Sequence, residues 1–249
     1  TNDVQDVFVY DRDTQQVARV SVAPDGTEAN GASWAPSISA EGNVIAFTSS
    51  ATNLFAADTN LSADVFAYDR DTQLLSRISV PLPEYDFPDY VTGDSWGPAL
   101  SNDGRLVAFV SWSNTLVEDN NGRLDVFVRD RQAGVTTRVS VTSDGTQTDR
   151  DSWAPAISGD GRFVAFASYF SHFVEDGNNR TDVFVHDRTT GDTSRASVFG
   201  ADTEAAGDSW APSISSDGHC VAFSSWADDL ASGDDNGRVD VYLRDRNAG

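Results

Sequence analysis

Acidic and amide side chains recur at fixed spacing before a short apolar run, as in VEDNNGRLDVFVRDR at 117–131. The pattern Asp-x-Asn-x-x-x-Asp occurs at Asp58, Asn60, Asp64; Asp119, Asn121, Asp125; Asp176, Asn178, Asp182; and Asp234, Asn236, Asp240, with Asn2 and Asp6 as a partial copy. Ca²⁺ takes roughly six to eight oxygen ligands, which such side chains supply if the loop curls. One interpretation is therefore a calcium site in each loop, although the last Glu of an EF-hand is missing.

A second interpretation needs no cation. Asp and Asn side chains form Asx turns and cap strand ends by bonding nearby backbone amides. Because the same loop recurs in either case, recurrence does not choose between calcium and capping.

Two sets of aromatic residues recur as well. One set opens a Ser-Trp-x-Pro motif and the other follows an Ala-Phe run: Trp34, Trp96, Trp153 and Trp210, and then Trp112, Tyr169 and Trp226, with Ser50 in the equivalent place of the first repeat. Aromatic faces beside carboxylates stack on sugar rings or grip a peptide. The alternative for the first set is core packing, which we favour for these four residues.

Signals for catalysis are few. The three histidines, His172, His186 and His219, do not recur and have no metal-ligand partner at short spacing. No nucleophile elbow, phosphate loop or dinucleotide fingerprint is present. Paired carboxylates for glycoside cleavage remain an alternative, yet every repeat offers the same acids. We therefore expect a protein that is not an enzyme.

The composition restricts the partners. The net charge is −22 and the chain contains no Lys, which disfavours nucleic acid. No apolar stretch reaches the ~20 residues needed to span a bilayer. The lone Cys220 excludes an internal disulfide and is expected to be a buried thiol. Since the sequence starts at Thr1 and contains no Met, we expect a mature or excised piece of an extracellular or periplasmic protein.

An internal repeat predicts the fold. The string Asp-Val-(Phe/Tyr)-x-x-Asp-Arg begins at Asp6, Asp64, Asp125, Asp182 and Asp240, at spacings of 58, 61, 57 and 58 residues. Three further short strands return between these strings, which predicts one all-β domain over 1–249, a β-propeller of four repeats with four-stranded antiparallel blades. Ser-Trp-x-Pro is strand A and innermost, Ala-Phe is B, Asp-Val-Phe is C, and Arg-x-Ser-Val, at Arg19, Arg77, Arg138 and Arg195, is D.

The loops of each repeat alternate in length. The A to B turns carry a Gly, whereas the B to C and D to A connections are long and emerge on one face, here called the loop face. Its longest member, 81–94, holds three aromatic residues and is either a binding feature or a cover for the channel mouth. The recurring Asp-Arg pairs that end strand C, such as Asp130-Arg131, predict ion pairs between strands or blades.

The repeats resemble a known family. PAISGDGRFVAFASY at 155–169 and PALSNDGRLVAFVSW at 98–112 resemble the Ser-Pro-Asp-Gly repeats of TolB-like β-propellers, and DVFVHDR resembles that family's third strand. The chain departs from the family in having Ala, Asn, Gly or Ser before the acidic-Gly turn in place of Pro. The resemblance implies a propeller that serves mostly in binding, with some catalytic members.

Closure of the ring and function remain as expectations. Strand C occurs five times but A, B and D four times, so we expect four blades closed by the amino-terminal strand D, with one spare C strand available for self-association. We expect a binding module for a protein or glycan at the loop face, with Ca²⁺ as a candidate cofactor. The alternatives are a structural piece of a secreted or cell-surface repeat array and a propeller glycosidase or lyase.

Overall fold

The computed structural model describes residues 2–248 except 57, 59, 83–92, 119–120, 170–172, 175–176 and 201–202, and the described residues form strands and connections without a helix. The strands are β1 (Phe8–Asp11), β2 (Gln16–Arg19), β3 (Ser33–Ile38), β4 (Val44–Ser49), β5 (Asp64–Asp69), β6 (Leu74–Arg77), β7 (Ser95–Leu100), β8 (Leu106–Ser111), β9 (Asp125–Asp130), β10 (Val135–Arg138), β11 (Ser152–Ile157), β12 (Phe163–Ser168), β13 (Asp182–Asp187), β14 (Thr193–Arg195), β15 (Val198–Phe199), β16 (Thr203–Glu204), β17 (Ser209–Ile214), β18 (Cys220–Ser225) and β19 (Asp240–Asp245). The described residues contain no helix that is long and apolar enough to cross a membrane.

The strands form successive antiparallel sheets, each a meander. Three sheets have four strands, β3 to β6, β7 to β10 and β11 to β14, in the predicted order A, B, C, D. The hairpin β1–β2 stands before them, and the three-stranded sheet β17–β18–β19 follows them. The pair β15–β16 is a small hairpin in the last D to A connection. This order confirms the all-β propeller architecture with four-stranded antiparallel sheets.

Strand D ends earlier than its motif suggests. The strands β2, β6, β10 and β14 end at the Arg of Arg-x-Ser-Val, and the Ser and Val follow the strand. In the sheet β3 to β6, one further backbone hydrogen bond forms after β6, from Ile78 N to Val65 O at 2.7 Å. The backbone N–H of Val65 then donates to the Ser79 hydroxyl at 3.2 Å, so a side chain replaces the next backbone hydrogen bond between the strands.

Tight turns join strands A and B, as their Gly residues predict. Gly42, Gly104, Gly161 and Gly218 have φ values of 73°, 69°, 73° and 73°, the left-handed region that Gly adopts without strain. Three of these glycines also lie against the preceding sheet: a Cβ at Gly161 would lie 2.1 Å from the side chain of Leu106. These turns therefore determine both the hairpin and the approach of neighbouring sheets.

The residue before the acidic-Gly turn is not Pro in this chain, unlike in the TolB-like repeats, and the structure gives a reason. The residue at that position donates its backbone N–H to the same position of the next repeat, from Ala40 to the Asn102 carbonyl at 2.9 Å, from Asn102 to Gly159 at 2.9 Å, and from Gly159 to Ser216 at 2.8 Å. Proline has no N–H and could not make these bonds. The turns therefore form a hydrogen-bonded row that links consecutive sheets.

We expect Ala40→Pro to destabilise the protein more than Ser216→Pro, because only Ala40 donates to the next turn. The lost hydrogen bond to the exposed Asn102 predicts a difference of about 0.5–1.5 kcal/mol in the free energy of unfolding. Urea denaturation of the two variants measures it. Equal effects would show that the row of bonds does not stabilise the protein.

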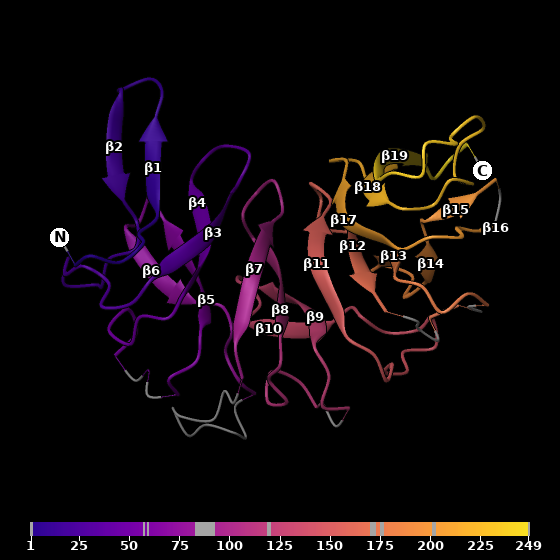
Figure 1. Ribbon diagram of the computed structural model, residues 1–249. Coiled ribbons are helices and arrows are strands. Elements are labelled where there is room, and N and C mark those ends of the chain that lie inside the picture. Colours follow the sequence, from indigo (N-terminus) through magenta and orange to yellow (C-terminus); the bar gives the residue numbers. More distant parts are fainter. Residues whose placement is uncertain are drawn as a thin grey trace.

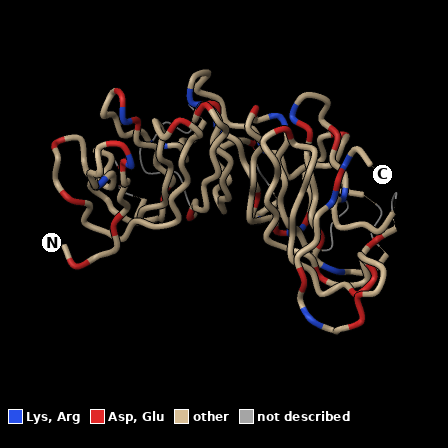
Figure 2. Tube along the Cα trace, turned by 90° about the horizontal axis from the view of Figure 1, so that it is seen from above, with Lys and Arg blue, Asp and Glu red and all other residues tan. Residues whose placement is uncertain are grey.

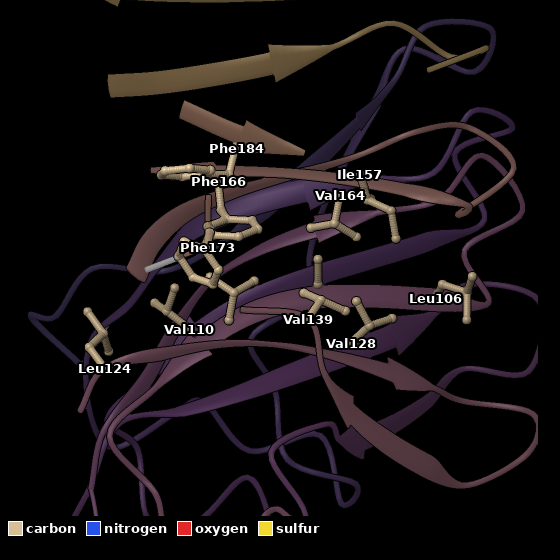
Figure 3. Close-up of a cluster of buried hydrophobic side chains, with 12 residues drawn as sticks. Leu106, Val110, Leu124, Val128, Val139, Ile157, Val164, Phe166, Phe173 and Phe184 are labelled. Carbon is tan, nitrogen blue, oxygen red and sulfur yellow. The ribbon is translucent and has the colours of Figure 1, made fainter. Parts of the chain in front are cut away.

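The core consists of separate clusters between adjacent sheets, and Figure 3 shows one of them. In one cluster, Val126 and Val128 of β9 meet Val164 and Phe166 of β12, all four fully buried. A second cluster joins β5 to β8, and a third joins β13 to β18. The four-stranded sheets thus bury both faces against their neighbours, as propeller blades do, whereas β1 and β19 at the two ends carry exposed apolar residues such as Phe8 and Val241.

The predicted closure of the ring is not found. The strand β2 pairs with β1, and β19 pairs in place with β18. The sheets follow an open arc whose two ends carry the two termini (Figures 1 and 2). The physical reason is that the β1–β2 hairpin buries Val7, Val9 and Val20 against Phe47 and Phe66, so its local packing holds it at its own end of the arc.

Candidate functional site: the loop face

The Asp that opens strand C is a buried junction between strands. Asp64 is fully buried, and its Oδ1 accepts hydrogen bonds from Arg77 Nη2 at 2.8 Å and Ser79 Oγ at 2.6 Å. Its Oδ2 accepts from Asn60 Nδ2 at 3.4 Å. Both oxygens are therefore used within the protein, by the outer strand and by the loop.

The same junction recurs in three other places. Hydroxyl groups of Ser21, Ser140 and Ser197 each donate to the equivalent Asp at 2.6 Å. Each hydroxyl also accepts the backbone N–H of the residue that follows that Asp. The Arg two positions before each Ser lies within ion-pair distance of that Asp, at 3.5, 3.5 and 3.4 Å. The sequence motifs Asp-Val-Phe and Arg-x-Ser-Val are thus two halves of one contact.

The Asn of the loop forms Asx turns, as the capping interpretation predicts. Its Oδ1 accepts the amide two residues ahead, with distances of 2.9, 2.8, 2.7 and 2.7 Å in the four complete copies at Asn60, Asn121, Asn178 and Asn236. The Nδ2 of Asn121 also donates to the Thr148 carbonyl at 3.0 Å and that of Asn178 to the Ala205 carbonyl at 2.6 Å. These bonds join the B to C loop to the D to A loop.

The first Asp of the loop behaves differently. Asp119 and Asp176 lie outside the described residues, but Asp58 and Asp234 each have a buried Oδ1 without a hydrogen-bond partner. Asp58 is only 7% exposed, and burial together with the nearby Asp64 carboxylate raises its pKa. No three His, Cys, Asp or Glu side chains of the described chain gather as a metal cluster. A cation here would need amide, carbonyl or water oxygens besides the carboxylates.

The two aromatic sets differ in exposure. Trp34, Trp96, Trp153 and Trp210 of strand A are half-buried, and two of them, Trp96 and Trp153, pack against the core. The residues after strand B project into solvent: Trp112 is 45%, Tyr169 55% and Trp226 53% exposed. The rings of Trp153 and Tyr169 are 4.5 Å apart between centroids, so a half-buried ring supports an exposed one.

Sequence reasoning missed an acidic residue that positions these aromatics. Asp94, Asp151 and Asp208 precede Ser-Trp in three repeats, and their Oδ1 atoms accept amides at positions 63, 124 and 181 of the preceding repeat, at 2.8, 3.1 and 2.9 Å. Their carbonyls accept the amides of the exposed aromatics, at 3.1 Å for Trp112 and 2.9 Å for Trp226. The recurrence of Asp-Ser-Trp, with Ala32 in the first repeat, is the signal that could have found them.

The Asp-Arg pairs are structural, as predicted. Arg70 lies 2.7 Å from Asp11 of the preceding hairpin, and Arg131 lies 3.8 Å from Asp69 of the preceding sheet. Each of these arginines also donates to a carbonyl of an A to B turn, from Arg70 to Gly42 at 3.1 Å and from Arg131 to Gly104 at 2.8 Å. A separate pair with Arg105 lowers the pKa of Asp130 to about 2.

The histidines and the longest loop contribute no catalytic arrangement in the described part. His186 is buried and bonded to Thr193 at 2.9 Å, and burial lowers its pKa. His219 lies on an A to B turn, at the opposite end of the strands from the loop face. His172 and most of the 81–94 loop, including its aromatic residues, lie outside the described residues.

The fold is that of the TolB-like β-propellers. Similar solved structures include a putative TolB from Agrobacterium tumefaciens, at 18% identity and a TM-score of 0.54, covering 94% of this chain and 68% of that one. Dipeptidyl peptidase 4 from Porphyromonas gingivalis is similar at 15% identity and a TM-score of 0.56, covering 98% of this chain and 35% of that one. An oligogalacturonate lyase in complex with manganese is similar at 11% identity and a TM-score of 0.53, covering 99% and 58%.

These likenesses establish the architecture alone. The chain spans 46% of the length of TolB from Acinetobacter baumannii, which it also resembles, at a TM-score of 0.49. No family model matches the sequence, and no curated protein matches it. Because the similar structures comprise TolB proteins, peptidases and a lyase, the fold is compatible with both binding and catalysis.

Proposed function

We propose that this chain is a non-catalytic binding module that holds a glycan against the aromatic residues of its loop face. The observation that carries the proposal is the exposure of Trp112, Tyr169 and Trp226 at equivalent positions of three consecutive repeats. Such rings present flat apolar faces next to backbone and carboxylate groups that accept hydrogen bonds, which suits sugar rings. The surrounding acids repel polyanions, so the ligand is a neutral or amino-sugar glycan.

The hydrogen-bonded acids at the base of the loop face support binding rather than turnover. Asp64, Asp125 and Asp182 are committed to Arg and Ser partners, and Asp94, Asp151 and Asp208 to backbone amides. Among the described carboxylates of this face, none lies beside the exposed aromatics and is also hydrogen-bonded to a side chain that could serve as its acid, base or nucleophile partner. A protein ligand is the other outcome that the same aromatic row would allow.

The proposal is tested by screening the intact chain against neutral and amino-sugar glycans, with a basic and a neutral protein as further probes. Trp226→Ala should weaken capture by about tenfold or more, since aromatic anchors contribute roughly 1–3 kcal/mol. Tyr10→Ala is the matched control, because Tyr10 is 57% exposed but lies away from the loop face. Binding that survives Trp226→Ala, or that needs Tyr10, would contradict the proposal.

We further propose that Ca²⁺ binds beside the first Asp of the B to C loop. The buried, unpartnered Oδ1 atoms of Asp58 and Asp234 support this, because a buried carboxylate oxygen without a donor is costly. With few carboxylates available, affinity belongs in the roughly 10⁻⁴–10⁻³ M range of extracellular modules. That range fits the extracellular or periplasmic location that we propose.

Calcium should raise the unfolding temperature of the wild-type protein, and Asp58→Asn should reduce this shift, because binding only to the folded state stabilises by mass action. Differential scanning calorimetry in millimolar calcium and in chelator measures both. Asp25→Asn, which changes an exposed loop acid, is the control. A calcium shift that is unchanged in Asp58→Asn would contradict this site.

A further inference from the structure

The first complete B to C loop carries an exposed leucine in a strained backbone conformation. Leu61 is 85% exposed and has a φ of 57°, in the left-handed region that bulky residues rarely adopt. The equivalent positions of the later repeats hold Gly122, Asn179 and Gly237, with φ values of 61°, 58° and 61°. Gly and Asn adopt this conformation more readily than Leu. Because Leu61 gains neither burial nor an easier backbone, the strain points to a role in binding.

The loop of Leu61 is joined to the exposed Trp112 of the next repeat. Two residues after Leu61, the Ala63 N–H donates to Asp94 Oδ1 at 2.8 Å. The Ala63 carbonyl accepts the N–H of Ser95 at 2.7 Å, and the Asp94 carbonyl accepts the N–H of Trp112 at 3.1 Å. Leu61, Asp94 and Trp112 therefore belong to one part of the aromatic row, here called the Trp112 subsite.

The other two exposed aromatics have the same frame with a different residue in place of Leu61. Equivalent aspartates join the loop of Gly122 to Tyr169 and the loop of Asn179 to Trp226. The position beside the aromatic is thus apolar in the first subsite, has no side chain in the second and is an amide in the third. The three subsites differ most in whether they offer apolar surface next to the ring.

The groups of the Trp112 subsite suit an acetamido substituent on a sugar. The Trp112 ring offers a flat face to the sugar, and Leu61 offers apolar surface to the acetamido methyl group. The Asp94 side chain is exposed, and a carboxylate has lone pairs enough to accept the acetamido N–H besides the amide that it already holds. A hydroxyl at the same carbon of the sugar would leave Leu61 without an apolar partner.

We propose that Leu61 is a specificity residue that selects N-acetylated amino sugars at the Trp112 subsite. The inference rests on the glycan binding proposed above and names the class of sugar. A contact with a methyl group changes affinity by roughly tenfold or more, which is enough to separate an acetamido sugar from its hydroxyl counterpart.

The probes are tetra-N-acetylchitotetraose and cellotetraose, which carry an acetamido group and a hydroxyl at the same carbon of each sugar. Calorimetry with the intact chain should show at least ~10-fold tighter binding of the acetylated tetrasaccharide. Leu61→Asn should reduce this preference to less than about threefold by weakening the acetylated ligand. Its urea midpoint should not fall, because Asn179 already adopts the same backbone conformation in another repeat.

Leu74→Asn is the matched control, because Leu74 is also an exposed leucine, 65% exposed, but begins β6 at the opposite end of the strands from the loop face. It should leave the preference unchanged. Equal binding of both tetrasaccharides by the wild-type protein, or a preference that survives Leu61→Asn, would overturn this inference and leave glycan binding in place. Absence of binding to every glycan would contradict the proposed function as well.

Discussion

Replacing Asp125 by Ala should lower the free energy of unfolding by about 3–5 kcal/mol, the usual cost of removing one partner of a buried charged pair. Asp125 is fully buried and accepts from Ser140 Oγ at 2.6 Å and Asn121 Nδ2 at 2.9 Å, beside Arg138. Its loss would leave the Arg138 side chain, only 5% exposed, without this carboxylate. Urea denaturation measures the change.

The chain provides a position-matched control in Asp240. This residue opens the equivalent strand, and among the described residues that strand pairs with β18 alone. Asp240→Ala in this chain should therefore cost about 1 kcal/mol or less. The two substitutions also separate the interpretations of the motif. Equal and large losses that appear only in calcium would show that the Asp of strand C is a metal ligand, contrary to the junction described above.

Phe184→Ala should be equally damaging, by about 3–5 kcal/mol, because it leaves a cavity in a packed core. The Phe184 ring is fully buried and lies 4.9 Å from Phe173 and 5.9 Å from Phe166 between centroids. Chemical denaturation of the purified variant gives the value. A loss below about 1 kcal/mol would contradict the packing between β12 and β13.

Phe8 occupies the same position of the repeat and is the control. It is 54% exposed at the free end of the open arc, so Phe8→Ala should cost less than about 1 kcal/mol. A loss as large as that of Phe184→Ala would mean that another sheet covers Phe8 in solution. The open arc would then be wrong.

The parts of this fold that depend on local chemistry could be predicted from the sequence. The recurring motifs and the turn glycines predicted the strands and their order, and the Asp-Arg pairs predicted the ion pairs. Closure could not be predicted, because pairing of β2 with β1 or with the last sheet depends on where Val7, Val9 and Val20 are buried. The sequence shows that such residues recur but not which surface they meet.

The candidate site shows the same limit at the level of single atoms. Asp58 and Asp64 belong to one spacing pattern, yet Asp64 is bonded to Arg77 and Ser79, whereas Asp58 keeps a buried oxygen without a partner. Spacing along the chain could not separate these roles, since Ser79 comes from another strand. Likewise the hydrogen bond that Asp94 accepts from the amide of residue 63 joins two repeats, so the sequence of a single repeat does not reveal it.

The central claim is that the repeated acids hold the loop face while the exposed aromatics bind the ligand. The most direct test is the affinity of the triple variant Trp112→Ala, Tyr169→Ala, Trp226→Ala for a captured glycan, measured by calorimetry beside its free energy of unfolding. We predict an affinity at least ~100-fold lower with stability changed by less than about 1 kcal/mol, because these side chains are about half exposed. Unchanged affinity in a folded triple variant would contradict the claim.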